Sequence, residues 1–202
     1  MKIIIMVEGA TEDVFIPSLR KHLKEKLEGR MPKLVTRKYN GRIPKGKRLH
    51  GDVANYLTGK SAADYVIALT DVYTGSNPPD FKNAEDAKSQ MKEWVNNDPR
   101  FFPHVAQYEF EAWLLPYWNT VQKLAGHNMK CPGNNPETVN HGKPPSHWLR
   151  EIFIKGRGGR HYVKSRDAAA ILRGKDLQTA IDKCAELRSL MDTIISLCER
   201  ER

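Results

Sequence analysis

The chain alternates between short apolar runs and longer segments in which apolar residues recur every three or four positions. A short, continuous apolar run is typical of a strand buried inside a parallel sheet, and the longer spacing is typical of an amphipathic helix. Four strands are predicted, at residues 2–7, 33–39, 64–70 and 101–107. Helices are predicted between them, at residues 11–27, 52–57, 83–95 and 109–118.

Strands that alternate with helices imply an α/β fold, a parallel sheet of about four strands with helices on its faces. The chain has 202 residues, enough for one large domain or a domain with an appendage. We predict an α/β domain at residues 1–118 and, packed on it, an irregular and helical extension at residues 119–202. The irregular part is residues 128–145, rich in Asn, Pro and Gly, and the pattern is helical from Ser165 onward.

Carboxylates follow three of the four predicted strands. Glu8 and Glu12 come after the first strand, Asp71 after the third, and Glu109 and Glu111 after the fourth. Because the carboxyl ends of parallel strands meet at one edge of a sheet, where ligands bind in open α/β folds, we expect these acids to lie close together.

Five gathered acids repel one another and must be paired or neutralised, by internal Lys or Arg or by Mg²⁺, which prefers oxygen ligands. For a single acid we favour a simpler interpretation, in which Glu12 caps its helix or Glu109 or Glu111 is solvated. For the whole set we favour a metal site. Gly9 is expected to allow a sharp turn that brings Glu12 back toward the strand, with Thr11 as the N-cap of the first helix.

Charge adds a second function class. The chain has 33 Lys and Arg against 24 Asp and Glu, a formal net charge of +9, which favours a polyanionic partner such as nucleic acid or simply provides solubility. Three cysteines without CxxC spacing indicate a reducing compartment. No apolar stretch is long enough to span a membrane, and the opening run is too short for a signal peptide, so we expect a cytoplasmic protein.

The positive charge is concentrated in two segments that contain no acid. Residues 37–48 hold six basic residues, and residues 155–166 hold a second group. Such runs are usually solvated loops, but two of them beside an acidic sheet edge favour nucleic-acid binding. The candidate nucleic-acid-binding residues are Arg42, Lys45, Lys47, Arg48, Arg157 and Arg160.

Three motifs together resemble a known family. VEGATE after the first strand, TDVYTG after the third and QYEFEAWLL after the fourth are similar to the motifs of the Toprim fold. The likeness extends through PETVNHGKPPS and HYVKSRDAAAIL to the terminal helix, so it covers nearly the whole chain. It is strongest to the small stand-alone Toprim-type proteins found beside ABC-type ATPases in bacterial phage-defence loci, relatives of the overcoming-lysogenization-defect nucleases.

The resemblance implies Mg²⁺-dependent (or Mn²⁺-dependent) hydrolysis of phosphodiester bonds in DNA or RNA. Glu8, Glu12 and Asp71 would bind metal, and Glu109 or Glu111 would complete the site. Lys164 resembles a lysine that sits near the scissile phosphate and stabilises developing charge. The implied partners are nucleic acid and an ABC-type ATPase, and self-association as a homodimer is an alternative.

One departure from the family pattern supports a rival function. The Toprim motif has Asp-x-Asp where this chain has Asp71, Val72 and Tyr73, and Asp80 is the only acid nearby that could replace the second one. The rival is a catalytically silent subunit that uses the same fold to bind nucleic acid or a partner.

Overall fold

The computed structural model describes residues 1–28, 31–72, 79–140 and 142–200. It contains one four-stranded sheet with the order β2-β1-β3-β4, in which every neighbouring pair is parallel. The strands are β1 (Lys2–Val7), β2 (Lys33–Lys38), β3 (Tyr65–Asp71) and β4 (Phe101–Ala106). The predicted α/β class and the four strands are confirmed, with strand ends shifted by at most one residue.

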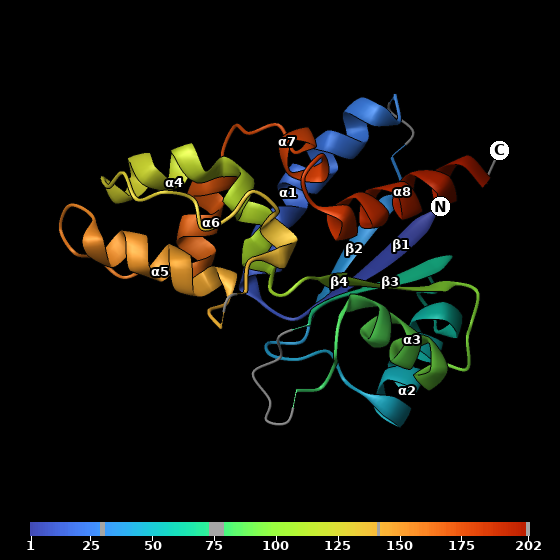
Figure 1. Cartoon of the computed structure of the whole chain (residues 1–202). Coiled ribbons are helices and arrows are strands. Elements are labelled where there is room, and N and C mark those ends of the chain that lie inside the picture. Colours follow the sequence, from blue (N-terminus) through green and yellow to red (C-terminus); the bar gives the residue numbers. More distant parts are fainter. Residues whose placement is uncertain (29–30, 73–78, 141, 201–202) are drawn as a thin grey trace.

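Helices cover both faces of the sheet (Figure 1). Because successive strand residues point to opposite faces, Ile3 and Ile5 belong to a core shared with α1 (Ala10–Lys26) and α8 (Ala185–Arg200). Ile4 and Met6 belong to the core beneath α2 (Gly46–Thr58) and α3 (Ala84–Trp94). The continuous apolar run of β1 therefore reflects a strand that is buried on both sides.

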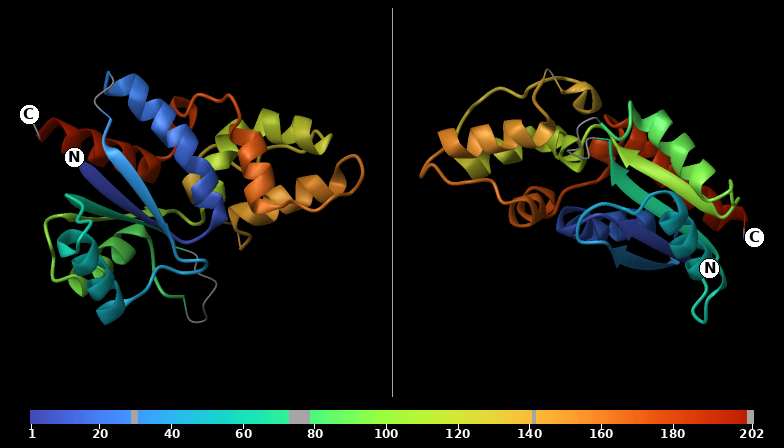
Figure 2. Two further views of the ribbon diagram at one scale, coloured as in Figure 1. Left: turned by 180° about the vertical axis from the view of Figure 1, so that it is seen from behind. Right: turned by 90° about the horizontal axis from the view of Figure 1, so that it is seen from below.

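The remaining elements form a helical lobe beyond the carboxyl ends of the strands (Figures 1 and 2). They are η1 (Phe110–Tyr117), α4 (Trp118–Ala125), η2 (Pro136–Thr138), α5 (Pro145–Lys155), α6 (Lys164–Leu172) and α7 (Gln178–Ile181). Side chains of this lobe, such as Leu149 and Ile171, share a core with the α1 face of the sheet. The division at residue 118 stays a prediction.

The first helix begins earlier than its sequence suggests. Its N-cap is Gly9, so the prediction of Thr11 at this position is wrong. The φ of Gly9 is −153°, an extended conformation, and a Cβ there would meet Glu12 only at an ordinary contact distance of 3.6 Å. The turn after β1 therefore does not require glycine.

Other helices differ from their predicted bounds. The helix expected at residues 52–57 begins at Gly46, so part of the first basic segment is helical. The helix expected at residues 109–118 is the 3₁₀ helix η1. The C-terminal helical pattern is divided into α6, α7 and α8. Sequence reasoning missed α5, although Pro145 at its first turn and apolar residues at helical spacing are signals for it.

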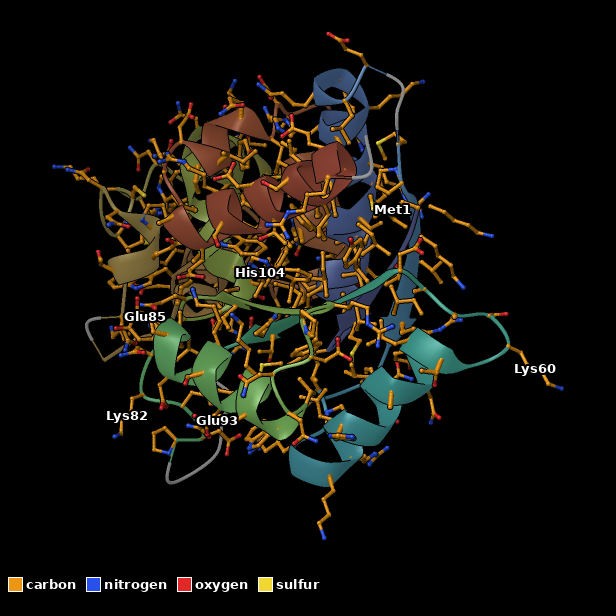
Figure 3. The ribbon with its side chains drawn as sticks, turned by 90° about the vertical axis from the view of Figure 1, so that its right-hand side faces the viewer. Met1, Lys60, Lys82, Glu85, Glu93 and His104 are labelled. Carbon is orange, nitrogen blue, oxygen red and sulfur yellow. The ribbon has the colours of Figure 1, made fainter. Side chains whose placement is uncertain are left out.

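Strand β4 forms an edge of the sheet, and helices from both faces meet around it. Lys88 of α3 and Glu186 of α8 form an ion pair at 2.9 Å. His104 of β4 lies between these helices, as Figure 3 shows, and is 3% exposed. Burial, with the positive charges of Lys88 and Lys92, lowers the pKa of His104 to about 3. This edge therefore holds a neutral, buried imidazole.

Candidate functional site

The carboxyl ends of β1, β3 and β4 bring the predicted acids to one end of the sheet. Val7 pairs with Leu69, and Asp71 pairs with Ala106, so the residues that follow these positions lie side by side. We call this region the acidic edge and define it by five residues, Glu8, Glu12, Asp71, Glu109 and Glu111. Figure 1 shows that it faces the helical lobe.

Glu8 is placed by the end of β1 and by a hydroxyl from β3. The Thr70 hydroxyl donates a hydrogen bond to Oε1 of Glu8. Burial raises the pKa of Glu8 to about 7, and the negative charge of Glu12 adds to the rise, although the bond from Thr70 opposes it. Sequence reasoning missed Thr70, whose only signal was its place immediately before Asp71.

Glu12 reaches back to the start of its own helix. The Gly9 backbone N–H donates to Oε2 of Glu12 at 3.1 Å. This is the capping alternative considered for Glu12, and its carboxylate also lies favourably at the positive end of the helix. Burial nevertheless raises the pKa of Glu12, which is 6% exposed. Capping therefore occupies one carboxylate oxygen at a position that still faces the other acids.

Asp71 is the residue that most strongly couples the acidic edge. Its Oδ1 accepts a hydrogen bond from the Phe110 N–H at 2.9 Å, which ties β3 to η1. Removal from water raises the pKa of Asp71 well above its ordinary value, and the charges of Glu8, Glu12 and Glu111 raise it further. The structure thus brings acids from three strand ends within strong electrostatic reach of one another.

The two acids after β4 are held by the helical lobe. Glu111 is fully buried, and the Lys164 ammonium lies 3.0 Å from its Oε1 and 3.3 Å from its Oε2. Burial raises the pKa of Glu111, and Lys164 opposes this rise. Glu109 is 7% exposed and accepts the Ser146 N–H at 2.9 Å, in the first turn of α5. The alternative of a solvated Glu109 or Glu111 is therefore wrong.

Carboxylate oxygens are the donors that a hard cation such as Mg²⁺ prefers, so the residue types of the acidic edge fit this ion. Within the described ranges, no group of three or more His, Cys, Asp or Glu side chains is arranged to hold one metal ion. Mg²⁺ usually takes one or two protein carboxylates and completes its shell with water and substrate phosphates. The crowded acids fit such an open site better than a closed cage.

The first basic segment lies beside the acidic edge. Arg42 and Lys45 line the same small cavity as Glu8 and Thr70. Asp80, the candidate substitute for the second acid of the motif, forms ion pairs with Arg42 at 3.4 Å and with Lys45 at 2.5 Å. Lys47 and Arg48 are exposed in the first turn of α2. Tyr73 lies outside the described residues.

The second basic segment is partly engaged in the fold. Arg160 pairs with the buried Asp167 at 2.9 Å, and its guanidinium lies 4.1 Å from the centre of the Phe153 ring. Arg157 is exposed, and Lys164 reaches from α6 to Glu111. The predicted nucleic-acid contacts of Arg157 and Arg160 stay predictions, and Arg160 has an evident structural role.

Comparison with known proteins places the chain in a family. The model of the family DUF4276, described as a domain of unknown function, matches residues 7–195. The chain belongs to this family. No protein with a curated functional description matches it.

Two solved structures share the fold along nearly their whole length. The C-terminal region of the Burkholderia pseudomallei OLD protein is 16% identical, with a TM-score of 0.53, over 97% of this chain and 98% of that one. The C-terminal region of the Xanthomonas campestris pv. campestris OLD protein is 15% identical, with a TM-score of 0.50, over 98% and 97%. The DUF4276 chain therefore has the Toprim-like fold of the OLD C-terminal region, as its motifs suggested.

The described helices include none that is both long and apolar enough to cross a membrane.

Proposed function

We propose that this DUF4276 protein is a metal-dependent nuclease that hydrolyses phosphodiester bonds of DNA or RNA. One observation supports the proposal most strongly. Glu8, Asp71 and Glu111, from three strand ends, repel one another strongly enough to raise the pKa of Asp71 well above its ordinary value. Folding preserves this unfavourable crowding, which a bound cation would relieve.

The acidic edge would hold Mg²⁺ or Mn²⁺ through Glu8, Glu12, Asp71, Glu109 and Glu111. Such an ion, when bound, supplies Lewis-acid stabilisation of a phosphodiester and lowers the pKa of a coordinated water. Glu12 and Glu109 each already have one oxygen bonded to a backbone N–H, so each offers its other oxygen more readily. Glu8 and Asp71 are accordingly the principal ligands in this proposal.

Lys164 would act beside these acids. Burial lowers its pKa, but Glu111 and Glu109 outweigh that effect, and the net pKa is raised. Its ammonium is therefore charged at every physiological pH and can stabilise negative charge that develops on a phosphate. Arg42, Lys45, Lys47, Arg48, Arg157 and Arg160 would hold the nucleic-acid strand.

The biological role that we propose follows from the resemblance of the sequence motifs. The protein would be a phage-defence effector that works with an ABC-type ATPase, and the partner would restrain a nuclease that is otherwise harmful to its host. A homodimer is the alternative assembly. Light scattering of the protein alone, and then with the ATPase added, tests both assemblies.

A second candidate function is a catalytically silent binding subunit. One observation favours it: the carboxylate of Asp80 lies on Arg42 and Lys45 instead of supplying the acid that is missing after Asp71. In this case the acidic edge and basic segments would bind nucleic acid or a partner without hydrolysis.

Cleavage assays separate the two candidates. Purified protein is incubated with Mg²⁺ or Mn²⁺ and with DNA and RNA substrates, alongside Glu8→Gln, Asp71→Asn and a control, Glu25→Gln, on the exposed side of α1. A nuclease loses activity in the first two variants, keeps it in the control and is inactive in EDTA. Binding without cleavage of any substrate would exclude the nuclease and favour the silent subunit.

A further inference from the structure

A single carboxylate, that of Asp80, holds two cations of the first basic segment. The Lys45 ammonium lies 2.5 Å from its Oδ1, and Nη1 of Arg42 lies 3.4 Å from its Oδ2. The side chains of Arg42 and Lys45 are 46% and 42% exposed, whereas that of Asp80 is only 14% exposed. Two solvent-accessible cations therefore converge on one shielded anion.

The backbone fixes this pair of cations next to the acidic edge. The Gly41 N–H donates to the backbone carbonyl of Glu8 at 2.8 Å, so the segment is attached where β1 ends. Arg42 and Lys45 then line one small cavity together with the side chains of Glu8 and Thr70. An anion between the two cations would consequently lie beside the candidate metal ligands.

A phosphodiester is chemically suited to replace Asp80. Like a carboxylate, it presents two oxygens that share one negative charge, and it accepts charge-assisted hydrogen bonds from Arg and Lys. Ion pairs between partly exposed side chains contribute little to stability, so a polyanion that releases counterions on binding can compete with them.

We propose that Arg42 and Lys45 form a phosphodiester-binding site beside the acidic edge, and that Asp80 occupies this site until a nucleic-acid strand displaces it. The inference rests on the proposed function, because it assigns the contact that holds the strand next to the candidate metal ligands. The simpler alternative is that Asp80 only fastens two loops together.

The test removes charge without changing shape. Binding of a fluorescein-labelled single-stranded DNA, and of an RNA of the same sequence, is measured by fluorescence anisotropy in EDTA over a series of NaCl concentrations. The variants are Asp80→Asn, the pair Arg42→Gln with Lys45→Gln, and all three together. Asp98→Asn is the matched control, because Asp98 pairs with Arg100 before β4, at the opposite end of the sheet.

Displacement predicts a specific pattern of affinities. Asp80→Asn binds both strands about tenfold more tightly at low salt, because the two cations no longer have an internal competitor. The Arg42 and Lys45 pair weakens binding and reduces the salt slope by about 1.4, since each lost phosphate contact on a single strand removes about 0.7. In that background Asp80→Asn has no further effect, and Asp98→Asn changes neither quantity.

Several results would overturn the inference. Wild-type affinity in a folded Asp80→Asn variant would show that Asp80 only fastens the loops, and equal tightening in the triple variant or in Asp98→Asn would show a general charge effect. If Asp80→Asn does not fold, an unchanged salt slope in the Arg42 and Lys45 pair refutes the site independently. Cleavage is measured separately with Mg²⁺, so these binding results stand whether or not the protein is a nuclease.

Discussion

The ammonium of Lys164 lies 3.0 Å from Oε1 of Glu111, and this contact joins α6 of the helical lobe to the acidic edge of the sheet. The two residues are 53 positions apart in sequence. Glu111 is fully buried, and the Lys164 side chain is 44% exposed, so the pair has a shielded anion and an accessible cation. A cation of the protein itself thus neutralises part of the charge that the strands bring together.

Replacing Lys164 should therefore expose the cost of burying Glu111. We expect Lys164→Met to reduce the free energy of unfolding by about 1–3 kcal/mol at pH 7.5, because it leaves an unpaired buried carboxylate. Adding Glu111→Gln should restore most of the loss. Urea unfolding of the two single variants and the double variant measures the coupling, and strictly additive effects would contradict it.

Relieving the acid crowding should stabilise the protein at high pH. The pKa of Glu8 is raised from 4.5 to about 7 in the fold, so the folded state holds more protons between these pH values and loses stability as the pH rises through 7. Glu8→Gln should raise the free energy of unfolding by about 1–3 kcal/mol at pH 8 and leave it unchanged below pH 4.5.

The same variant tests the metal site. Added Mg²⁺ should raise the unfolding temperature of the wild-type protein and of Glu25→Gln, since an ion that binds only the folded state stabilises it. Glu8→Gln should show little or no rise. An equal rise in all three proteins would remove Glu8 from the site.

The two arginines of the second basic segment should behave differently. Arg160→Ala should cost about 1–3 kcal/mol of stability, because it removes a cation from the buried Asp167 and from the Phe153 ring. Arg157→Ala, at an exposed position, should change stability by less than about 0.5 kcal/mol. Equal unfolding midpoints in urea would mean that Arg160 has no structural role.

His104 should make the protein sensitive to acid. Its pKa is lowered from 6.5 to about 3, so between these values the unfolded state binds the additional proton and stability falls as the pH falls. Between pH 7.5 and 4.5 we expect the wild-type protein to lose about 2–3 kcal/mol more than His104→Leu. Urea unfolding at both pH values measures the difference, and parallel losses would refute it.

Local pattern was sufficient for the sheet and for the location of the acids. The apolar runs of β1 and β3 identify strands buried on both faces, and parallel strands must end at a common edge. Glu8, Asp71 and Glu109 could therefore be assigned to one region from their positions alone. The family motifs pointed to the same fold, which the solved OLD structures share.

Tertiary structure decided which partner each charge has. Glu109 lies on the Ser146 N–H, Glu111 on Lys164, and Asp80 on the first basic segment. Each of these contacts joins residues more than thirty positions apart, and hydrophobic periodicity contains no information about such pairs. The sequence thus determined that acids and bases occur near the sheet edge. Only the packing of the helical lobe against that edge determined which of them are neutralised and which are available to a ligand, because electrostatic interactions depend on distance in space.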